Sequence, residues 1–140
     1  MSDASRMPAS APVRQRVDAH LNTLVHDVDG LMGVVVASLD GFALAQIGRE
    51  EDTVSRLAAM SSSMLALAEA LGRELAIGPL GALILEAAHG KVLMLTVPVQ
   101  PPQLLMVACD QTSAMGQVLW HAKQCARRLA ATLPPDATTP

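Results

Sequence analysis

The chain has 140 residues, of which 51% are hydrophobic but only 1% aromatic, and its formal net charge is −3. Lys and Arg are scattered, so there is no basic stripe for a phosphate backbone, and Phe42 and Trp120 are too few to form a stacking platform or an aromatic cage. Nucleic-acid binding is therefore not expected, and the length suits one domain of about 120 residues with a real core.

Both ends of the chain are small, polar and proline-containing. We predict a disordered leader over residues 1–11, a domain over residues 12–133 and a disordered tail over residues 134–140. The N-terminus has no apolar stretch of the signal-peptide kind, and the longest uncharged run, Val92–Cys109, is interrupted by prolines. No segment is therefore expected to insert into a membrane.

The two cysteines, Cys109 and Cys125, lack the spacing of a disulfide framework or a zinc cluster. Cys109 lies in an apolar run and Cys125 in a helical pattern. We predict that both are reduced core thiols of a cytoplasmic protein.

A first amphipathic helix is predicted between the leader and Gly30, because apolar residues recur at every third or fourth position. These residues are Val13, Val17, Leu21, Leu24 and Val28. The run Leu31–Leu39 that follows is apolar at nearly every position, which is typical of a central strand covered on both faces. Asp40-Gly41 then favours a two-residue type I′ hairpin turn into an edge strand over residues 42–48.

A long middle helix is predicted over residues 52–71, where Asp52 can cap its start and Gly72 is placed to end it. The helix then runs out through residues 73–75 to Gly78-Pro79. A wide apolar stripe should cover the sheet, and it contains Val54, Leu57, Met60, Ser61, Met64, Leu65, Leu67, Ala68 and Leu71. The opposite face is small and uncharged, and it contains Ala59, Ser62, Ser63, Ala66 and Ala70. A helix that is apolar or small all round is usually covered on both sides, so we expect a second copy of the chain against this face. The alternative is that Ala and Ser are merely tolerated in a helix.

A second hairpin is predicted over residues 80–88 and 91–99, with His89-Gly90 as its turn. The first of these strands carries only one charge, Glu86, so an exposed edge would be an aggregation hazard unless it pairs with its own copy in a dimer. The run Gln103–Cys109 is apolar on both faces and should be a central strand beside Leu31–Leu39.

The last helix should begin near Asp110 to Ser113, any of which could cap it, and end before Pro134. Its inner stripe is Val118, Ala122, Cys125 and Leu129. Trp120 points away from that stripe, either to pack sideways on the first helix, which is the favoured interpretation, or to contact a partner. The elements predict a sheet with the first and last helices on one face and the middle helix on the other.

No catalytic grouping, metal site or cofactor motif has credible spacing. GxSxG, GxxxxGK[ST], HExxH and GxGxxG are all absent, and the four histidines are scattered: His20, His26, His89 and His121. Ser61–Ser63 has no neighbouring base, and a turn explains Asp40. We therefore expect no catalytic residue, no bound metal and no cofactor.

The segments GVVVASLDGFALA, RLAAMSSSMLALAEALG, ALILEAAHGKVLMLTVP and LLMVACD, followed by a closing helix, together resemble the roadblock family of dynein light chains and its bacterial members. The resemblance covers roughly residues 13–132. It implies an α+β, profilin-like fold: a three-layer α/β/α sandwich with a five-stranded, mainly antiparallel sheet. It also implies a homodimer, joined through the third strands and the middle helices.

The same resemblance implies a non-enzymatic regulator or scaffold of a small Ras-like GTPase, which would dock on the paired middle helices. Arg56 and Arg73 could contact an acidic partner there; the alternative is that both are simply solvated charges. The full predicted interface is Ala59, Ser62, Ser63, Ala66, Ala70, Leu80, Ala82, Ile84, Arg56 and Arg73. One alternative is a ligand-sensing adaptor that uses Ser38, Gln46 and Thr96 as interior polar groups. A third hypothesis is a hydrolase that uses Asp40 or the serine triplet.

Overall fold

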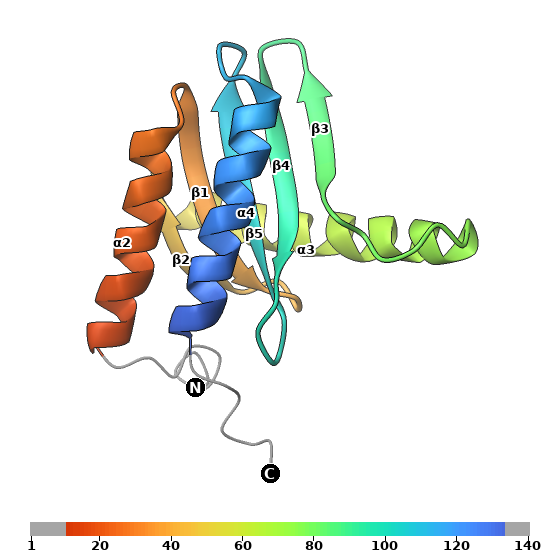
Figure 1. Cartoon of the computed structure of the whole chain (residues 1–140), viewed down its shortest axis with the longest axis horizontal. Coiled ribbons are helices and arrows are strands. Elements are labelled where there is room, and N and C mark those ends of the chain that lie inside the picture. Colours follow the sequence, from red (N-terminus) through yellow and green to blue (C-terminus); the bar gives the residue numbers. More distant parts are fainter. Residues whose placement is uncertain (1–10, 134–140) are drawn as a thin grey trace.

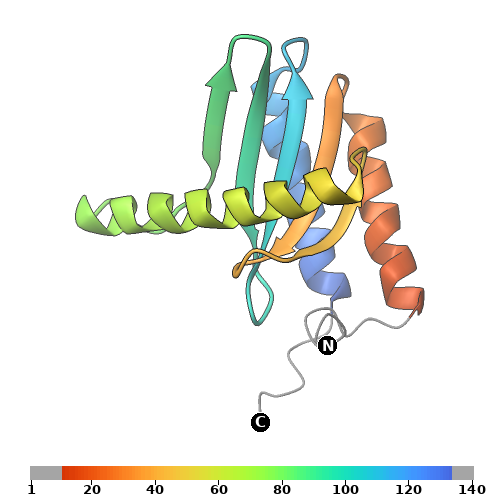
Figure 2. The same cartoon turned by 180° about the vertical axis from the view of Figure 1, so that it is seen from behind.

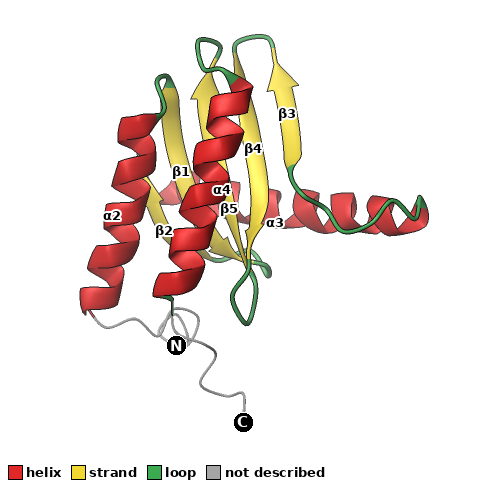
Figure 3. Cartoon of the chain, in the orientation of Figure 1, coloured by secondary structure: helices red, strands yellow, loops and turns green. Residues whose placement is uncertain are grey.

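The computed structural model of the protein describes residues 11–133, and the predicted order of elements is confirmed (Figure 3). In chain order the elements are α2 (Ala11–Asp27), β1 (Leu31–Ser38), β2 (Ala43–Ile47), α3 (Glu51–Glu74), β3 (Leu83–Ala87), β4 (Gly90–Val97), β5 (Gln103–Asp110) and α4 (Met115–Thr132). The predicted leader and tail lie outside the described residues, except Ala11, which is helical.

The five strands form one antiparallel sheet in the order β2-β1-β5-β4-β3. Strands β1 and β5 are therefore central and adjacent, as their unbroken apolar sequences predict. Val34, Val35 and Val36 of β1 are all 0% exposed, because helices cover both faces of the sheet. The edges of the sheet are β2 and β3.

Helices α2 and α4 lie side by side on one face of the sheet, and α3 crosses the other face (Figures 1 and 2). The alternation of side chains along β5 divides the core between these layers. Leu105 and Val107 belong to the core beneath α2 and α4, whereas Leu104 and Met106 belong to the core beneath α3. The predicted inner stripe of α4 is confirmed, since its four residues are at most 1% exposed.

The turn between β1 and β2 is longer than the predicted two-residue type I′ turn. Ala37 pairs with Ala43, the register shifts just before this pair, and four residues, 39–42, connect the strands. Gly41 has a φ of 99°, but Asp40 does not have the positive φ that a type I′ turn requires at both central positions. The side chain of Ser38 organises the loop instead, because it bonds to Asp40 and to the backbone of Phe42.

The turn between β3 and β4 also differs from the prediction, by one residue. Ala87 pairs with Gly90, so the two connecting residues are Ala88 and His89, and Gly90 is already part of β4. A Cβ at position 90 would lie only 2.7 Å from the carbonyl oxygen of Cys109. Gly90 is therefore required by its close approach to β5 rather than by the turn.

Helix α3 begins one residue earlier than predicted, and Gly72 does not end it. Its N-cap is Glu50, which makes no side-chain capping bond, so the prediction that Asp52 caps the helix is wrong. Asp52 lies in the first turn, where its charge favours the positive end of the helix dipole. The helix continues through Gly72 and ends at Glu74, before Ala76 takes a φ of 53°.

Helix α4 begins at Met115, and none of the four predicted capping residues caps it. Its N-cap is Ala114, without a side-chain bond. Asp110 instead accepts hydrogen bonds from the hydroxyl and from the backbone N–H (2.8 Å) of Thr112, and these two bonds are the main reason that the pKa of Asp110 is lowered. Ser113 donates to the carbonyl of Asp29, and this bond ties the loop before α4 to the loop after α2.

Candidate interaction surface on α3 and β3

The N-terminal half of α3 is the part that packs on the sheet. Val54, Ala58, Ser61 and Leu65 are at most 3% exposed, and they recur every three or four residues along one side of the helix. Val35 and Ala37 of β1 lie in the same core cluster. This stripe holds α3 across the sheet.

Ser62 does not lie where the sequence predicted. It was expected on the outer face, but it is only 9% exposed, and its hydroxyl donates to the carbonyl of Ala59 (3.0 Å). The reason is the β1–β2 turn, since a Cβ at Gly41 would lie 3.2 Å from Ser62 Oγ and 3.4 Å from Ala59 Cα. The helix passes so close to the turn that only small residues fit between them.

Three large residues predicted to cover the sheet are instead exposed. Met60 is 54% exposed, Leu67 71% and Leu71 60%. At 100° per residue they lie on one flank of α3, so they form a single apolar stripe. The predicted inner stripe was therefore too wide, and its Met60, Leu67 and Leu71 flank is free of the chain's own core.

The C-terminal half of α3 extends past β3 and beyond the sheet (Figure 2). Leu75 and Ile77, at and just after the end of the helix, are 60% and 72% exposed. Exposed apolar surfaces of this kind are typical of sites of interaction. The sequence contained this signal in the absence of charge over residues 57–68, but not the overhang itself.

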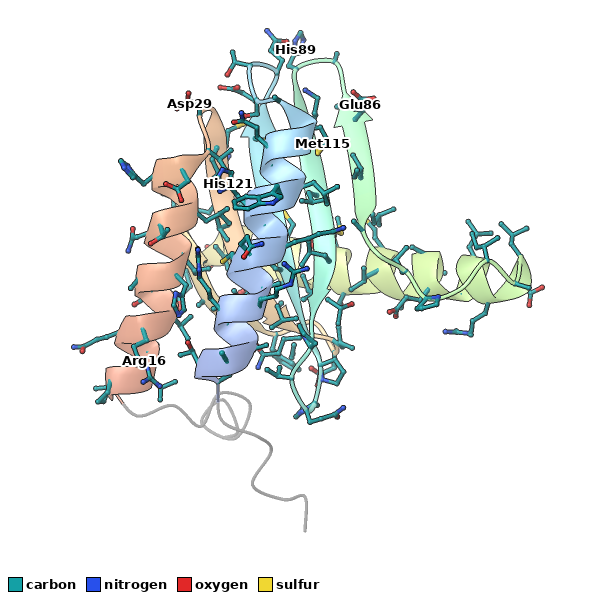
Figure 4. The ribbon with its side chains drawn as sticks, in the orientation of Figure 1. Arg16, Asp29, Glu86, His89, Met115 and His121 are labelled. Atoms are coloured by element: carbon teal, nitrogen blue, oxygen red, sulfur yellow. The ribbon has the colours of Figure 1, made fainter. Side chains whose placement is uncertain are left out.

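Strand β3 is the second part of this surface. It is an edge strand, and its residues Ile84 and Leu85 are 44% and 39% exposed on opposite faces of the sheet. Glu86, labelled in Figure 4, is the only charged residue of the strand. The free backbone groups of such a neutral edge favour pairing with another strand.

The remaining residues of the predicted interface occupy different environments. Ala59, Ser63, Ala66, Arg56 and Arg73 are exposed on α3, and Ala70 is half-buried. Leu80 and Ala82 are half-buried against the chain's own two cores. The structure thus brings the α3 residues and Ile84 to the outside of the molecule, whereas Ser62, Leu80 and Ala82 pack on their own chain. Their role in an interface stays a prediction.

A hollow of about 740 Å³ lies beneath the overhanging end of α3. Glu69 and Arg73 of the helix line it, together with Leu80 and Thr96 from the sheet side. Thr96 is one of three polar residues considered for ligand sensing. The other two lie elsewhere, since Ser38 bonds within the β1–β2 turn and the Gln46 side chain accepts a hydrogen bond from the N–H of Arg49 (3.1 Å). The three groups do not converge on one pocket.

The side chains of Asp40 and Ser62, which were considered for a hydrolase, make local hydrogen bonds, and that of Asp40 accepts one from Ser38 within the β1–β2 turn. Ser62 donates to a helix carbonyl and is not paired with a base. Within residues 11–133, no three His, Cys, Asp or Glu side chains lie close enough to hold a metal ion. Both cysteines are free and buried, and burial raises the pKa of Cys125 to about 11, so this thiol stays protonated near neutral pH.

Residues 18–100, which include the whole of α3 and β3, match the family model of the Roadblock/LC7 domain. The chain belongs to the Roadblock/LC7 family. Comparison with curated protein sequences finds no significant match. Of the described helices of this Roadblock/LC7 protein, none combines the length and the apolar character that crossing a bilayer requires.

Solved Roadblock/LC7 structures share its fold. The Roadblock/LC7 domain from Streptomyces avermitilis has a TM-score of 0.74 at 18% identity, with 79% of this chain and 91% of that chain covered. The gliding protein MglB from Thermus thermophilus has a TM-score of 0.77 at 19% identity, with 89% of this chain and 93% of that chain covered. An MglB described as having a tetrameric arrangement has a TM-score of 0.78 at 21% identity, with 89% of this chain and 92% of that chain covered.

Proposed function

We propose that this Roadblock/LC7 protein is a non-enzymatic homodimer that docks a small Ras-like GTPase on its paired α3 helices and so regulates or localises it. The observation that carries the proposal is the overhang of α3, which leaves Leu67 and Leu71 more than half exposed. Burying such side chains stabilises an assembly by about 1.5–3 kcal/mol each. A second copy of the same helix is the simplest partner for this surface.

The free edge of β3 supports the same arrangement. If two β3 strands pair, the sheets of two protomers become one continuous sheet and the exposed edge disappears. The overhanging ends of the two α3 helices then lie against the partner protomer on the same side of that sheet. One symmetric contact between two copies would therefore cover both the apolar stripe of α3 and the free edge of β3.

Docking of a GTPase is supported by the resemblance of the chain to the roadblock family and by the character of the outer face of α3. Ala59, Ser63 and Ala66 are small and exposed, so another backbone can approach this face closely. Arg56 and Arg73 flank these residues and can pair with carboxylates of a partner. A platform of this kind acts by ordering the switch loops of a GTPase, without supplying a catalytic group.

Dimerisation is tested with the double variant Leu67→Glu, Leu71→Glu. Two charges on the apolar stripe should convert the dimer into a monomer at micromolar concentration, as measured by sedimentation equilibrium. The matched control is Asn22→Glu, an exposed position of α2 on the other face of the sheet, which should leave the dimer intact. A wild-type chain that sediments as a monomer would contradict the proposal.

Docking is tested by capturing a Ras-like GTPase from native cells with the wild-type protein and measuring its GTP hydrolysis. The rate should change when wild-type protein is added and should stay at its basal value with the Leu67→Glu, Leu71→Glu variant. If the rate is the same with and without the wild-type protein, a regulatory role is excluded. A GTPase that binds the monomeric variant equally well would remove α3 as the docking site.

A further inference from the structure

Trp120 lies on the outward face of α4, where its exposed ring contacts a neighbouring imidazole. The side chain is 58% exposed, and the ring meets the imidazole of His121 edge-on, with centroids 5.0 Å apart and planes at 89°. His121, labelled in Figure 4, lies with its Nδ1 3.9 Å from Asp27 Oδ2 at the end of α2. Such a contact reduces the orientations open to the ring, so less entropy is lost when a partner covers it.

Basic residues surround this ring on an otherwise acidic protein. Helix α4 contains Lys123, Arg127 and Arg128 but no Asp or Glu, whereas the whole chain has a net charge of −3. All three side chains are exposed, and none forms an ion pair within residues 11–133. Positions 120, 123 and 127 fall on one side of the helix, so the ring and two cations form a continuous surface.

The order of these groups defines the chemistry of a matching partner. Along the helix axis, Lys123 lies about 5 Å and Arg127 about 10 Å from Trp120. A partner helix therefore fits if it carries an apolar side chain with carboxylates three and seven positions further along. Trp and Arg are also the residue types that contribute most to binding at protein interfaces.

We propose that the Trp120–Lys123–Arg127 face of α4 is a docking surface for an acidic amphipathic segment of a second protein. This surface lies on the face of the sheet opposite α3 (Figures 1 and 2). It also lies outside residues 18–100, the part of the chain that matches the family model. The α4 surface is thus independent of the proposed dimer, and it gives each protomer a second attachment point.

The test uses Trp120 as its own reporter, since it is the only tryptophan and the chain has no tyrosine. The probe is a fluorescein-labelled 14-residue helical peptide that contains leucine with glutamates three and seven positions further along. We expect a saturable blue shift of the Trp120 emission, matched by a rise in peptide anisotropy, and weaker binding as salt is added. A peptide with glutamine in place of both glutamates should not bind.

The variant Lys123→Glu, Arg127→Glu should weaken peptide binding by about tenfold or more, because two attractive contacts become repulsive. Trp120→Ala should also lose the anisotropy signal. Arg14→Glu, exposed near the start of α2, is the matched control and should bind within about twofold of wild type. Circular dichroism of each variant checks that the helices are retained.

Four results would overturn the proposal. The first is equal binding of the glutamine peptide, and the second is equal binding by the Lys123→Glu, Arg127→Glu variant. The third is a blue shift with vesicles of phosphatidylserine but not with the peptide, which would assign the surface to a membrane. The fourth is self-association that depends on Lys123 and Arg127. The Leu67→Glu, Leu71→Glu monomer should still bind the peptide, so failure of the α4 surface and failure of the dimer are distinguishable.

Discussion

The two layers that cover the sheet differ in how much of their apolar surface they bury. On one side, Val118, Ala122 and Leu129 of α4 are completely buried. On the other side, α3 buries its N-terminal stripe but leaves Leu67 and Leu71 in solvent. The inner stripe of α4 is buried along its whole length within one chain, whereas the apolar residues of α3 are buried only over its first half. The proposed dimer would use the apolar surface that the α3 layer leaves exposed.

The sharpest way to separate the two layers is to truncate one leucine in each. Leu129→Ala should lower the free energy of unfolding by about 3 kcal/mol, because it removes a fully buried side chain and leaves a cavity. Leu71→Ala should cost much less and should act mainly through the dimer, so its effect should grow with protein concentration. Urea unfolding at two protein concentrations measures both. If both variants lose the same free energy of unfolding at both protein concentrations, the two layers do not differ in the way described.

Replacing a glycine in each region should give a smaller difference in the free energy of unfolding. Gly30 has a φ of 83°, and a Cβ there would overlap Asp110 Oδ1 and lie 2.6 Å from Ser113 Oγ. Gly78, near the overhang, has a φ of 95° but nothing within 4 Å of such a Cβ. Gly30→Ala should therefore lower the free energy of unfolding by about 2 kcal/mol, and Gly78→Ala by about 1 kcal/mol. Equal losses would show that backbone strain alone, and not the joined loops, makes Gly30 necessary.

The smallest expected effect is a pH dependence confined to the α2/α4 layer. Burial lowers the pKa of His20 below its ordinary value of 6.5, and Arg128 and Arg16 lower it further. As the pH falls below 6.5 the unfolded chain takes up this proton first, so the stability of the folded chain decreases. The imidazole of His20 also bonds to Thr132 Oγ1 (2.8 Å). The melting temperature of His20→Gln should fall less than that of wild type between about pH 7.5 and about pH 5.5, and an identical fall would contradict this assignment.

The strands could be placed from the sequence because burial on both faces has a distinctive pattern. Leu31–Leu39 and Gln103–Cys109 have no polar alternation, and this indicated that both are central and neighbours. The edge position of β3 was implied by the resemblance to the roadblock family, and its single charge indicated only that such an edge should be paired. The placement of the two central strands depends on the strand period alone, which does not change with the details of packing.

The orientation of α3 could be predicted only in part. Apolar and small residues fill most of its circumference, so the pattern did not define which of them faces the sheet. The orientation of α3 is set by Gly41 of the β1–β2 turn, which lies close to the helix. This contact requires small residues such as Ser62 on the inner side, so Met60 faces outward. This contact joins residues far apart in the sequence, and no local pattern encodes it. For Trp120 the favoured interpretation was packing sideways on the first helix, whereas its side chain is 58% exposed, because exposure at this position depends on how α4 packs beside α2.

The position of β5 in the middle of the sheet has a consequence for synthesis of the chain. The two hairpins, β1–β2 and β3–β4, are not neighbours, and both depend on residues 103–110 to join them. During translation those residues leave the ribosome after both hairpins have been made. Until then β1 and β4, the strands that pair with β5, have unpaired backbone groups along one side. A nascent chain stalled before residue 103 should consequently bind chaperones strongly, and release of residues 103–110 should let the sheet close in one step.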